Sequence, residues 1–162
     1  MIKLLPEPKK RIRWLTKEGA SRLLKELPDH QEKIARFALL TGLRQRNILE
    51  LQWSQIDMVR GVAWIHPDQA KARKPIGVPL SPEVRELLRS LIGVHDLFVF
   101  TFKGEPVRQV NTLAWRKALK RAGISDFRWH DLRHTWASWH VQAGTPLHVL
   151  QEKWEDGSRS RW

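Results

Sequence analysis

The sequence of 162 residues contains no cysteine, no tyrosine and no long apolar run. The absence of cysteine fits a reducing compartment and leaves no thiolate that could complete a metal site. No segment approaches the roughly 20 apolar residues that a membrane span needs. In residues 1–8 the apolar part is short and proline comes early, so we expect no signal peptide. We therefore expect a cytoplasmic protein with no membrane partner.

Positive charge is what the chain has in excess. Its 29 Lys and Arg against 17 Asp and Glu give a formal net charge of +12. A polyanion is the natural partner of such a chain, although basicity for solubility alone is an alternative. The cations cluster at residues 9–13, 44–46, 71–74, 116–121 and 128–133. Clusters in every major segment favour a wrapped nucleic-acid strand over a single basic tail.

Hydrophobic periodicity and turn residues predict the elements of one domain. Helices are expected over residues 16–27, 30–40, 81–93, 109–122 and 131–143, directly after Gly42, and from Pro146 to about residue 152. Strands are expected over residues 62–65 and 76–80, joined as a hairpin, and over 97–100. The predicted fold class is mainly α (α+β), a helical bundle with a small antiparallel sheet. Residues 14–152 form its core, 1–13 a basic linker or arm, and 153–162 an atypical, disordered tail.

The expected core faces follow from residues at helical spacing. They include Ala20, Leu23, Leu24 and Leu27; Ile34, Phe37 and Ala38; Val110, Leu113, Ala114, Ala118 and Leu119; and Leu132, Trp136 and Ala137. Tryptophans 129, 136 and 139 either belong to this core or stack on nucleic-acid bases.

The richest chemistry lies in residues 127–136. In a helix from Asp131 onward, His130 and Arg133 stand on one face, so that their donors point into one cleft. An imidazole beside a guanidinium fork suits a phosphate, although the same pair is common on an ordinary polar helix face. Arg44, in the first turn after Gly42, can aim its fork at an anion or tie down a loop carbonyl.

Three motifs occur in a fixed order: Thr41-Gly42-Leu43-Arg44, then Lys71 seven residues before Val78-Pro79-Leu80, then His130-Asp131-Leu132-Arg133-His134-Thr135. Together they resemble the catalytic domain of the tyrosine recombinases, the phage integrase family, over roughly residues 14–152. The resemblance implies transesterification of double-stranded DNA without metal or other cofactor. In that reaction a tyrosine hydroxyl attacks a backbone phosphate and forms a 3′-phosphotyrosyl link.

The resemblance also implies roles for individual residues. Arg44 and Arg133 would hold the non-bridging phosphate oxygens, Lys71 would protonate the departing 5′ oxygen, and His130 would be the acid/base group. Further DNA contacts are expected from the remaining clustered cations and one histidine: Arg46, Arg73, Lys74, Arg116, Lys117, Lys120, Arg128 and His134. Other recombinase subunits are expected partners, in a bacterial or phage setting.

The sequence departs from the family pattern at its end. Family members carry the nucleophilic tyrosine in a helix that follows the one begun by Pro146, whereas this chain has no tyrosine. We interpret residues after about Lys153 as the product of truncation or a frame shift. The hypothesis is a chain that binds DNA but does not cleave it. Asn47 also stands where many members have an acidic residue, so the support of Arg44 is expected to differ.

Two other functions remain open at this point. A metal-dependent nuclease is suggested by His130 and His134, which are four residues apart, but no carboxylate cluster completes such a site. A non-enzymatic DNA-binding module or regulatory remnant is the second alternative, since loss of the nucleophile leaves DNA binding intact.

Overall fold

The computed structural model describes residues 13–66, 75–146 and 149. The elements along this part of the chain are α1 (Lys17–Glu26), α2 (Asp29–Thr41), α3 (Gln45–Leu49), a 3₁₀ helix (Trp53–Gln55), β1 (Ile56–Asp57), β2 (Val62–Ile65), β3 (Ile76–Pro79), α4 (Pro82–Arg89), β4 (Thr101–Phe102), β5 (Glu105–Pro106), α5 (Leu113–Arg121) and α6 (Asp131–Gln142). The helices predicted from Thr16, Gly42, Ser81 and Asp131 are all present. None of the helices described is long and apolar enough to cross a membrane.

Side-chain caps fix where three helices begin. Thr16 accepts a hydrogen bond from the Gly19 amide at 3.0 Å and starts α1, and Ser81 accepts one from Val84 before Pro82, the first residue of α4. Thr112 accepts from the Trp115 amide at 3.2 Å and starts α5. A capping oxygen satisfies one of the amides that a helix start leaves without a carbonyl partner. These caps place the starts of α1 and α4 where the sequence predicted them.

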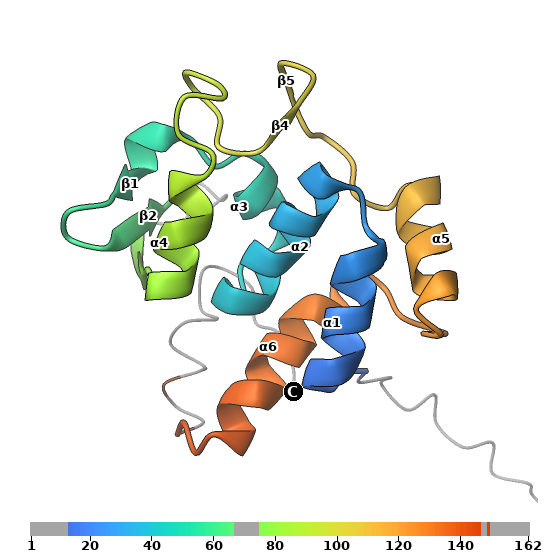
Figure 1. Ribbon diagram of the computed structural model, residues 1–162. Coiled ribbons are helices and arrows are strands. Elements are labelled where there is room, and N and C mark those ends of the chain that lie inside the picture. The colour runs from blue at the N-terminus through green and yellow to red at the C-terminus, as the bar shows by residue number, and fades with distance from the viewer. Residues whose placement is uncertain (1–12, 67–74, 147–148, 150–162) are drawn as a thin grey trace, which may run out of the picture.

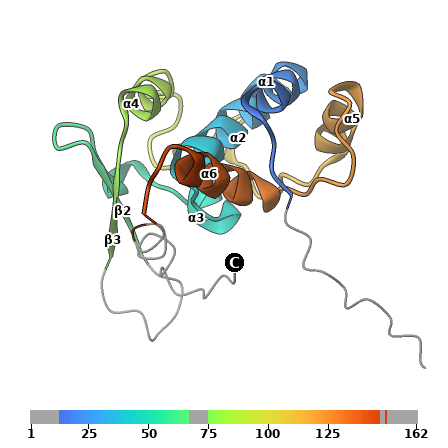
Figure 2. The same ribbon diagram turned by 90° about the horizontal axis from the view of Figure 1, so that it is seen from below.

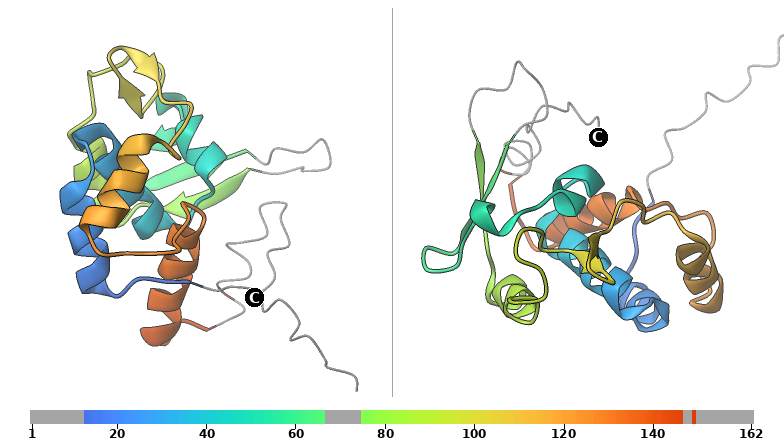
Figure 3. Two further views of the ribbon diagram at one scale, coloured as in Figure 1. Left: turned by 90° about the vertical axis from the view of Figure 1, so that its right-hand side faces the viewer. Right: turned by 90° about the horizontal axis from the view of Figure 1, so that it is seen from above.

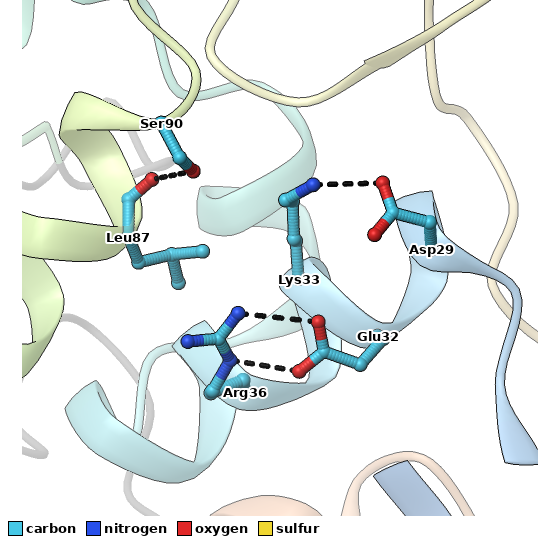
Figure 4. Close-up of polar contacts among 6 residues, drawn as sticks. All are labelled: Asp29, Glu32, Lys33, Arg36, Leu87 and Ser90. Atoms are coloured by element: carbon cyan, nitrogen blue, oxygen red, sulfur yellow. Dashed lines mark hydrogen bonds and ion pairs between the residues drawn. The ribbon is translucent and has the colours of Figure 1, made fainter. Parts of the chain in front are cut away.

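The helix α2 lies at the centre of the fold and contacts α1, α3, α4 and α6 (Figure 1). Its inner face carries Ile34, Phe37 and Ala38, all at most 1% exposed, as predicted. Its outer face carries two ion pairs one turn apart, Lys33–Asp29 and Arg36–Glu32, each at 2.7 Å (Figure 4). Apolar burial on one side and solvated pairs on the other make α2 the element on which the rest packs.

The larger sheet is antiparallel with the order β1-β2-β3, and Val62 lies opposite Pro79 while Ile65 lies opposite Ile76. This pairing is the hairpin that the sequence predicted. The strands β2 and β3 leave the helical layer on the side where α3 lies (Figures 2 and 3). The helices α4 and α5 lie at opposite ends of the molecule, with α2 between them (Figure 1).

Two parts of the sequence-based fold are wrong. Residues 97–100 are not a strand: Phe98 makes only an isolated bridge to Gln52, because the His95 Nδ1 accepts the amides of Leu97 and Phe98 and holds a turn there. The short hairpin of β4 and β5 follows instead.

The helix predicted from Gln109 begins at Leu113. The Gln109 Oε1 accepts the amides of Val110 and Asn111 at 3.1 Å, which holds a turn before the Thr112 cap. Leu113, predicted in the core, is 58% exposed, and Trp115, at 2%, is the large buried side chain of α5.

Candidate active site

Arg44 is placed by the turn that ends α2. Gly42 adopts the left-handed conformation, with φ at 69°, and its amide donates to the Ala38 carbonyl at 2.9 Å. A side chain here would collide with the Trp136 ring, 2.3 Å from the position of a Cβ atom, so the turn lies directly against α6. Arg44 follows as the residue that precedes α3, and its carbonyl accepts the Ile48 amide at 3.1 Å. The glycine therefore sets how closely Arg44 approaches α6.

His130 and Arg133 lie at the start of α6. The Arg133 amide donates to the His130 carbonyl at 3.0 Å, which closes the first turn. Trp129, the residue before His130, is buried, with 7% of its surface exposed. Its ring centroid lies 4.9 Å from that of Trp115 on α5. Arg133 itself is 3% exposed, although a guanidinium is among the groups most costly to bury.

The structure brings Arg44, His130 and Arg133 together around one small cavity of about 40 Å³, which Leu43 and Trp129 also line. A water molecule occupies roughly 30 Å³ in the liquid, so the cavity admits an oxygen atom of a ligand but no nucleotide. Arg44 and Arg133, almost 90 residues apart in sequence, thus converge as two permanent cations at one point. This is the arrangement that holds the oxygens of a phosphate.

Burial lowers the pKa of His130 from its usual value, and the neighbouring His134, Arg133 and Arg44 lower it further, while Asp131 opposes them. Because the ordinary pKa of a histidine is about 6.5 and that of His130 lies lower, His130 is mainly neutral at pH 7 and can accept a proton. The site therefore combines two fixed positive charges with a neutral base.

A larger cavity of about 340 Å³ lies elsewhere, lined by β3, the C-terminal end of α2, Trp136 and His140. None of Arg44, His130 and Arg133 lines it, and its walls are largely apolar. The larger cavity is not the candidate active site, because a reaction at a phosphate needs charged groups, and these line the smaller cavity.

In the part of the chain that the structure describes, no group of three or more His, Cys, Asp or Glu side chains could hold a metal ion. The Nδ1 of His134 lies 3.1 Å from the Asp131 carboxylate. A carboxylate on one ring nitrogen is common for histidines that bind metal through the other, so this contact does not decide the question. What the metal-nuclease alternative lacks, among the described residues, is a third ligand.

The other predicted contact residues have different surroundings. Arg116, Lys117, Lys120 and Arg128 are exposed, and Arg116 donates to the Asn111 carbonyl and side chain at 3.3 Å. Arg46 is exposed and pairs with Glu50 at 3.2 Å, whereas the His134 side chain is only 18% exposed. Lys71, Arg73 and Lys74 lie outside the described residues, as do 1–12 and 150–162, so the roles assigned to them stay predictions.

The three tryptophans belong to the packed interior rather than to a stacking surface. Trp129 and Trp136 are buried, and Trp139 packs against the core while its indole nitrogen donates to the Leu15 carbonyl at 2.9 Å. Sequence reasoning missed Asp131, which is 3% exposed and bonded to His134. The spacing of an acid and a histidine three residues apart on one helix was the available signal.

A family model described as the phage integrase family matches residues 13–156. The chain belongs to the phage integrase family. Over 167 residues it is 50% identical to the integrase of Salmonella phage P22, covering 93% of this chain and 43% of that protein. It is 36% identical to the shufflon-specific DNA recombinase of Escherichia coli, covering 78% of this chain and 31% of that protein. The chain thus spans less than half the length of each of these two relatives.

Solved structures show the same fold. The catalytic domain of bacteriophage HP1 integrase matches with a TM-score of 0.66 at 24% identity, covering 91% of this chain and 83% of that one. The XerA recombinase matches with a TM-score of 0.72 at 20% identity, and the match covers 93% of this chain and 57% of that one. A lambda integrase dimer bound to a COC′ core site matches with a TM-score of 0.68 at 19% identity, and the match covers 95% of this chain and 51% of that one. The predicted fold class, a mainly α (α+β) helical bundle with a small antiparallel sheet like that of tyrosine-recombinase catalytic domains, is confirmed.

Proposed function

We propose that this chain is the DNA-binding catalytic core of a site-specific recombinase that integrates or recombines double-stranded DNA by metal-free transesterification. The observation that carries the proposal is the convergence of Arg44, Arg133 and His130 on one cavity. Phosphoryl transfer is catalysed mainly by positioning and by fixed positive charge aimed at the phosphate oxygens. Two guanidinium groups supply that charge without a metal, because arginine stays protonated at every physiological pH.

Each of these residues has its own role in the proposed reaction. Arg44 and Arg133 bind the two non-bridging oxygens of the scissile phosphate, and His130 accepts or returns the proton of the attacking hydroxyl. Lys71 donates a proton to the departing 5′ oxygen, a role for which the high pKa of arginine is unsuited. The exposed cations of α5 and Arg128 hold the flanking backbone. Such a reaction belongs in the bacterial cytoplasm, where the DNA lies, and the lambda integrase dimer on DNA supports other recombinase subunits as partners.

We further propose that the chain as it stands binds DNA without cleaving it. The reaction needs a tyrosine hydroxyl, and the 162 residues contain none. Binding depends on the arginines and the basic surface, which remain. A regulatory module that occupies recombination sites is therefore the second function that the sequence favours.

Incubation with DNA that carries a nick beside the scissile phosphate tests cleavage. With this DNA a cleaving enzyme is trapped covalently, because the short released strand diffuses away. We expect no adduct that survives denaturing electrophoresis. A covalent adduct would show that another hydroxyl replaces the tyrosine and would overturn the claim that the chain only binds.

The phosphate site is tested by binding. Arg133→Ala should weaken the complex with recombination-site DNA roughly 10- to 150-fold, since a charge-assisted hydrogen bond contributes about 1.5–3 kcal/mol. Arg133→Lys keeps the charge but loses the two-pronged donor, and should recover only part of the affinity. Arg60→Ala is the control, because Arg60 is 81% exposed in the turn between β1 and β2. Equal losses for Arg133→Ala and Arg60→Ala would contradict the site.

A further inference from the structure

Asp131 follows the candidate base His130 in the sequence, and each of the two oxygens of its buried carboxylate makes a polar contact. One oxygen, Oδ2, accepts the Arg128 amide at 2.8 Å, which fixes the turn that leads into α6. The other, Oδ1, lies 3.1 Å from the Nδ1 of His134. An ionised carboxylate only accepts hydrogen bonds, so the proton of this contact belongs to the imidazole. Asp131 therefore holds His134 with Nδ1 protonated and with its ring in one orientation.

His134 in turn contacts His130. The two rings meet nearly at a right angle, 87°, with centroids 5.0 Å apart. The two residues are four apart at the start of α6, so the contact is between neighbours on one helix face. His130 keeps a surface exposed to solvent, although part of the residue is desolvated. The His134 ring thus lies against one side of the candidate base.

We propose that Asp131 and His134 are positioning residues for His130: the carboxylate orients the His134 ring, and that ring keeps the His130 imidazole turned toward the cavity of Arg44 and Arg133. The inference rests on the proposed function insofar as His130 is the acid/base group. It assigns His134 to the support of the site rather than to the DNA surface. The low exposure of the His134 side chain, 18%, agrees with this.

Asp131 and His134 also influence the pKa of His130. The charged and titratable groups that act on His130 are Arg44 at the start of α3, and Asp131, Arg133 and His134 on α6. His134 and the two arginines disfavour the protonated form of His130 and so lower its pKa, whereas the Asp131 carboxylate favours that form and raises the pKa. Removing Asp131 or His134 should therefore shift the pKa of His130 in opposite directions.

Nuclear magnetic resonance of the full chain, labelled with ¹⁵N at histidine, tests the proposal. In the unaltered chain we expect the His130 ring in one orientation, with contacts between its ring protons and those of His134. His134→Ala removes this ring contact, so the His130 ring should sample more than one orientation. His134→Phe keeps a ring that cannot be protonated, so it should keep the single orientation and move the pKa of His130 upward. Asp131→Asn should lower that pKa.

His66→Gln is the matched control, because His66 is exposed at the end of β2 and should leave His130 unchanged. Asp131→Asn alters a buried group that could be needed for folding, and the two His134 variants keep the test decisive in that event. An unchanged ring orientation in His134→Ala or an unchanged pKa of His130 in His134→Phe overturns the proposal.

Binding of the unaltered chain to recombination-site DNA separates the two hypotheses. If DNA binds but His130 does not respond to the His134 variants, the recombinase function stands and the positioning pair fails. If His130 responds as expected but DNA does not bind, the pair stands as a structural fact and the proposed function fails.

Discussion

Gly42 shows how one residue fixes the distance between α2 and α6. Its φ of 69° is strained for any other residue, and the space for a Cβ atom is filled by the Trp136 ring. Gly42→Ala should lower the free energy of unfolding by roughly 3 kcal/mol, from backbone strain and overpacking together. Urea unfolding measures the loss. Gly123→Ala is the control: its φ is 73°, but nothing lies within 4 Å of its Cβ position, so only about 1–2 kcal/mol is expected. Equal losses would show that the contact with Trp136 is unimportant.

The pKa of His130 makes a prediction about pH. Burial lowers this pKa in the folded chain, so below the unfolded value of about 6.5 the unfolded chain binds more protons than the folded chain. The stability contribution of the neutral ring is fully present above pH 6.5 and declines as the pH falls toward the folded pKa. His30, whose pKa burial also lowers, acts in the same direction. Urea midpoints between pH 7.5 and 5.5 should fall less steeply in His130→Gln than in the unaltered chain. Identical slopes would exclude a depressed pKa.

At the scale of elements, α6 is tied to the segment before α1. The Thr135 hydroxyl donates to the Asp131 carbonyl at 2.8 Å and accepts the Leu15 amide at 3.1 Å, and Thr135 is completely buried. The Trp139 indole donates to the Leu15 carbonyl. The helix that carries His130 and Arg133 is thus fixed by both backbone groups of a residue more than 100 positions away in sequence.

Thr135→Val tests this attachment because valine has nearly the same shape but no hydroxyl. The Leu15 amide would lose its partner in the interior, which should cost about 1–3 kcal/mol of unfolding free energy. Ser138→Ala, which removes a hydroxyl bonded only to Gln142 on the outer side of α6, should stay within about 0.5 kcal/mol. Chemical denaturation compares the two. A loss no larger for Thr135→Val than for Ser138→Ala would show that α6 is held by other contacts.

At the scale of the molecule, a net charge of +12 predicts DNA binding that weakens steeply with salt. Lys117 and Lys120 are exposed on α5, next to the segment that leads to His130. Each contact to a phosphate contributes about 0.9 to the slope of log K against log salt concentration. Lys117→Ala and Lys120→Ala should each reduce that slope by roughly this amount, in titrations from 50 to 200 mM salt. Arg89→Ala, at the end of α4 on the far side of the molecule, should not change it. An unchanged slope in both α5 variants would place the DNA elsewhere.

Local patterns in the sequence determined most of the elements. Thr16 and Ser81 mark helix starts because their hydroxyls cap amides within three residues, and Ile34, Phe37 and Ala38 mark a buried face because helical spacing is local. The same local reasoning failed at residues 97–100 and at Gln109, where a histidine and a glutamine side chain bond to nearby backbone amides. Such bonds compete with strand and helix pairing and leave little trace in hydrophobic periodicity.

The motifs named Arg44, His130 and Arg133, but only the tertiary structure brought them to one cavity. Their convergence depends on the close packing of Gly42 against Trp136 and on the attachment of α6 to Leu15, which are contacts between residues about 90 and 120 positions apart. The support of His130 by Asp131 and His134 likewise depends on side-chain orientation. Residue types and spacing determine what chemistry a chain can carry, while packing decides which groups meet, because a distance in space between remote residues is not encoded by any local pattern.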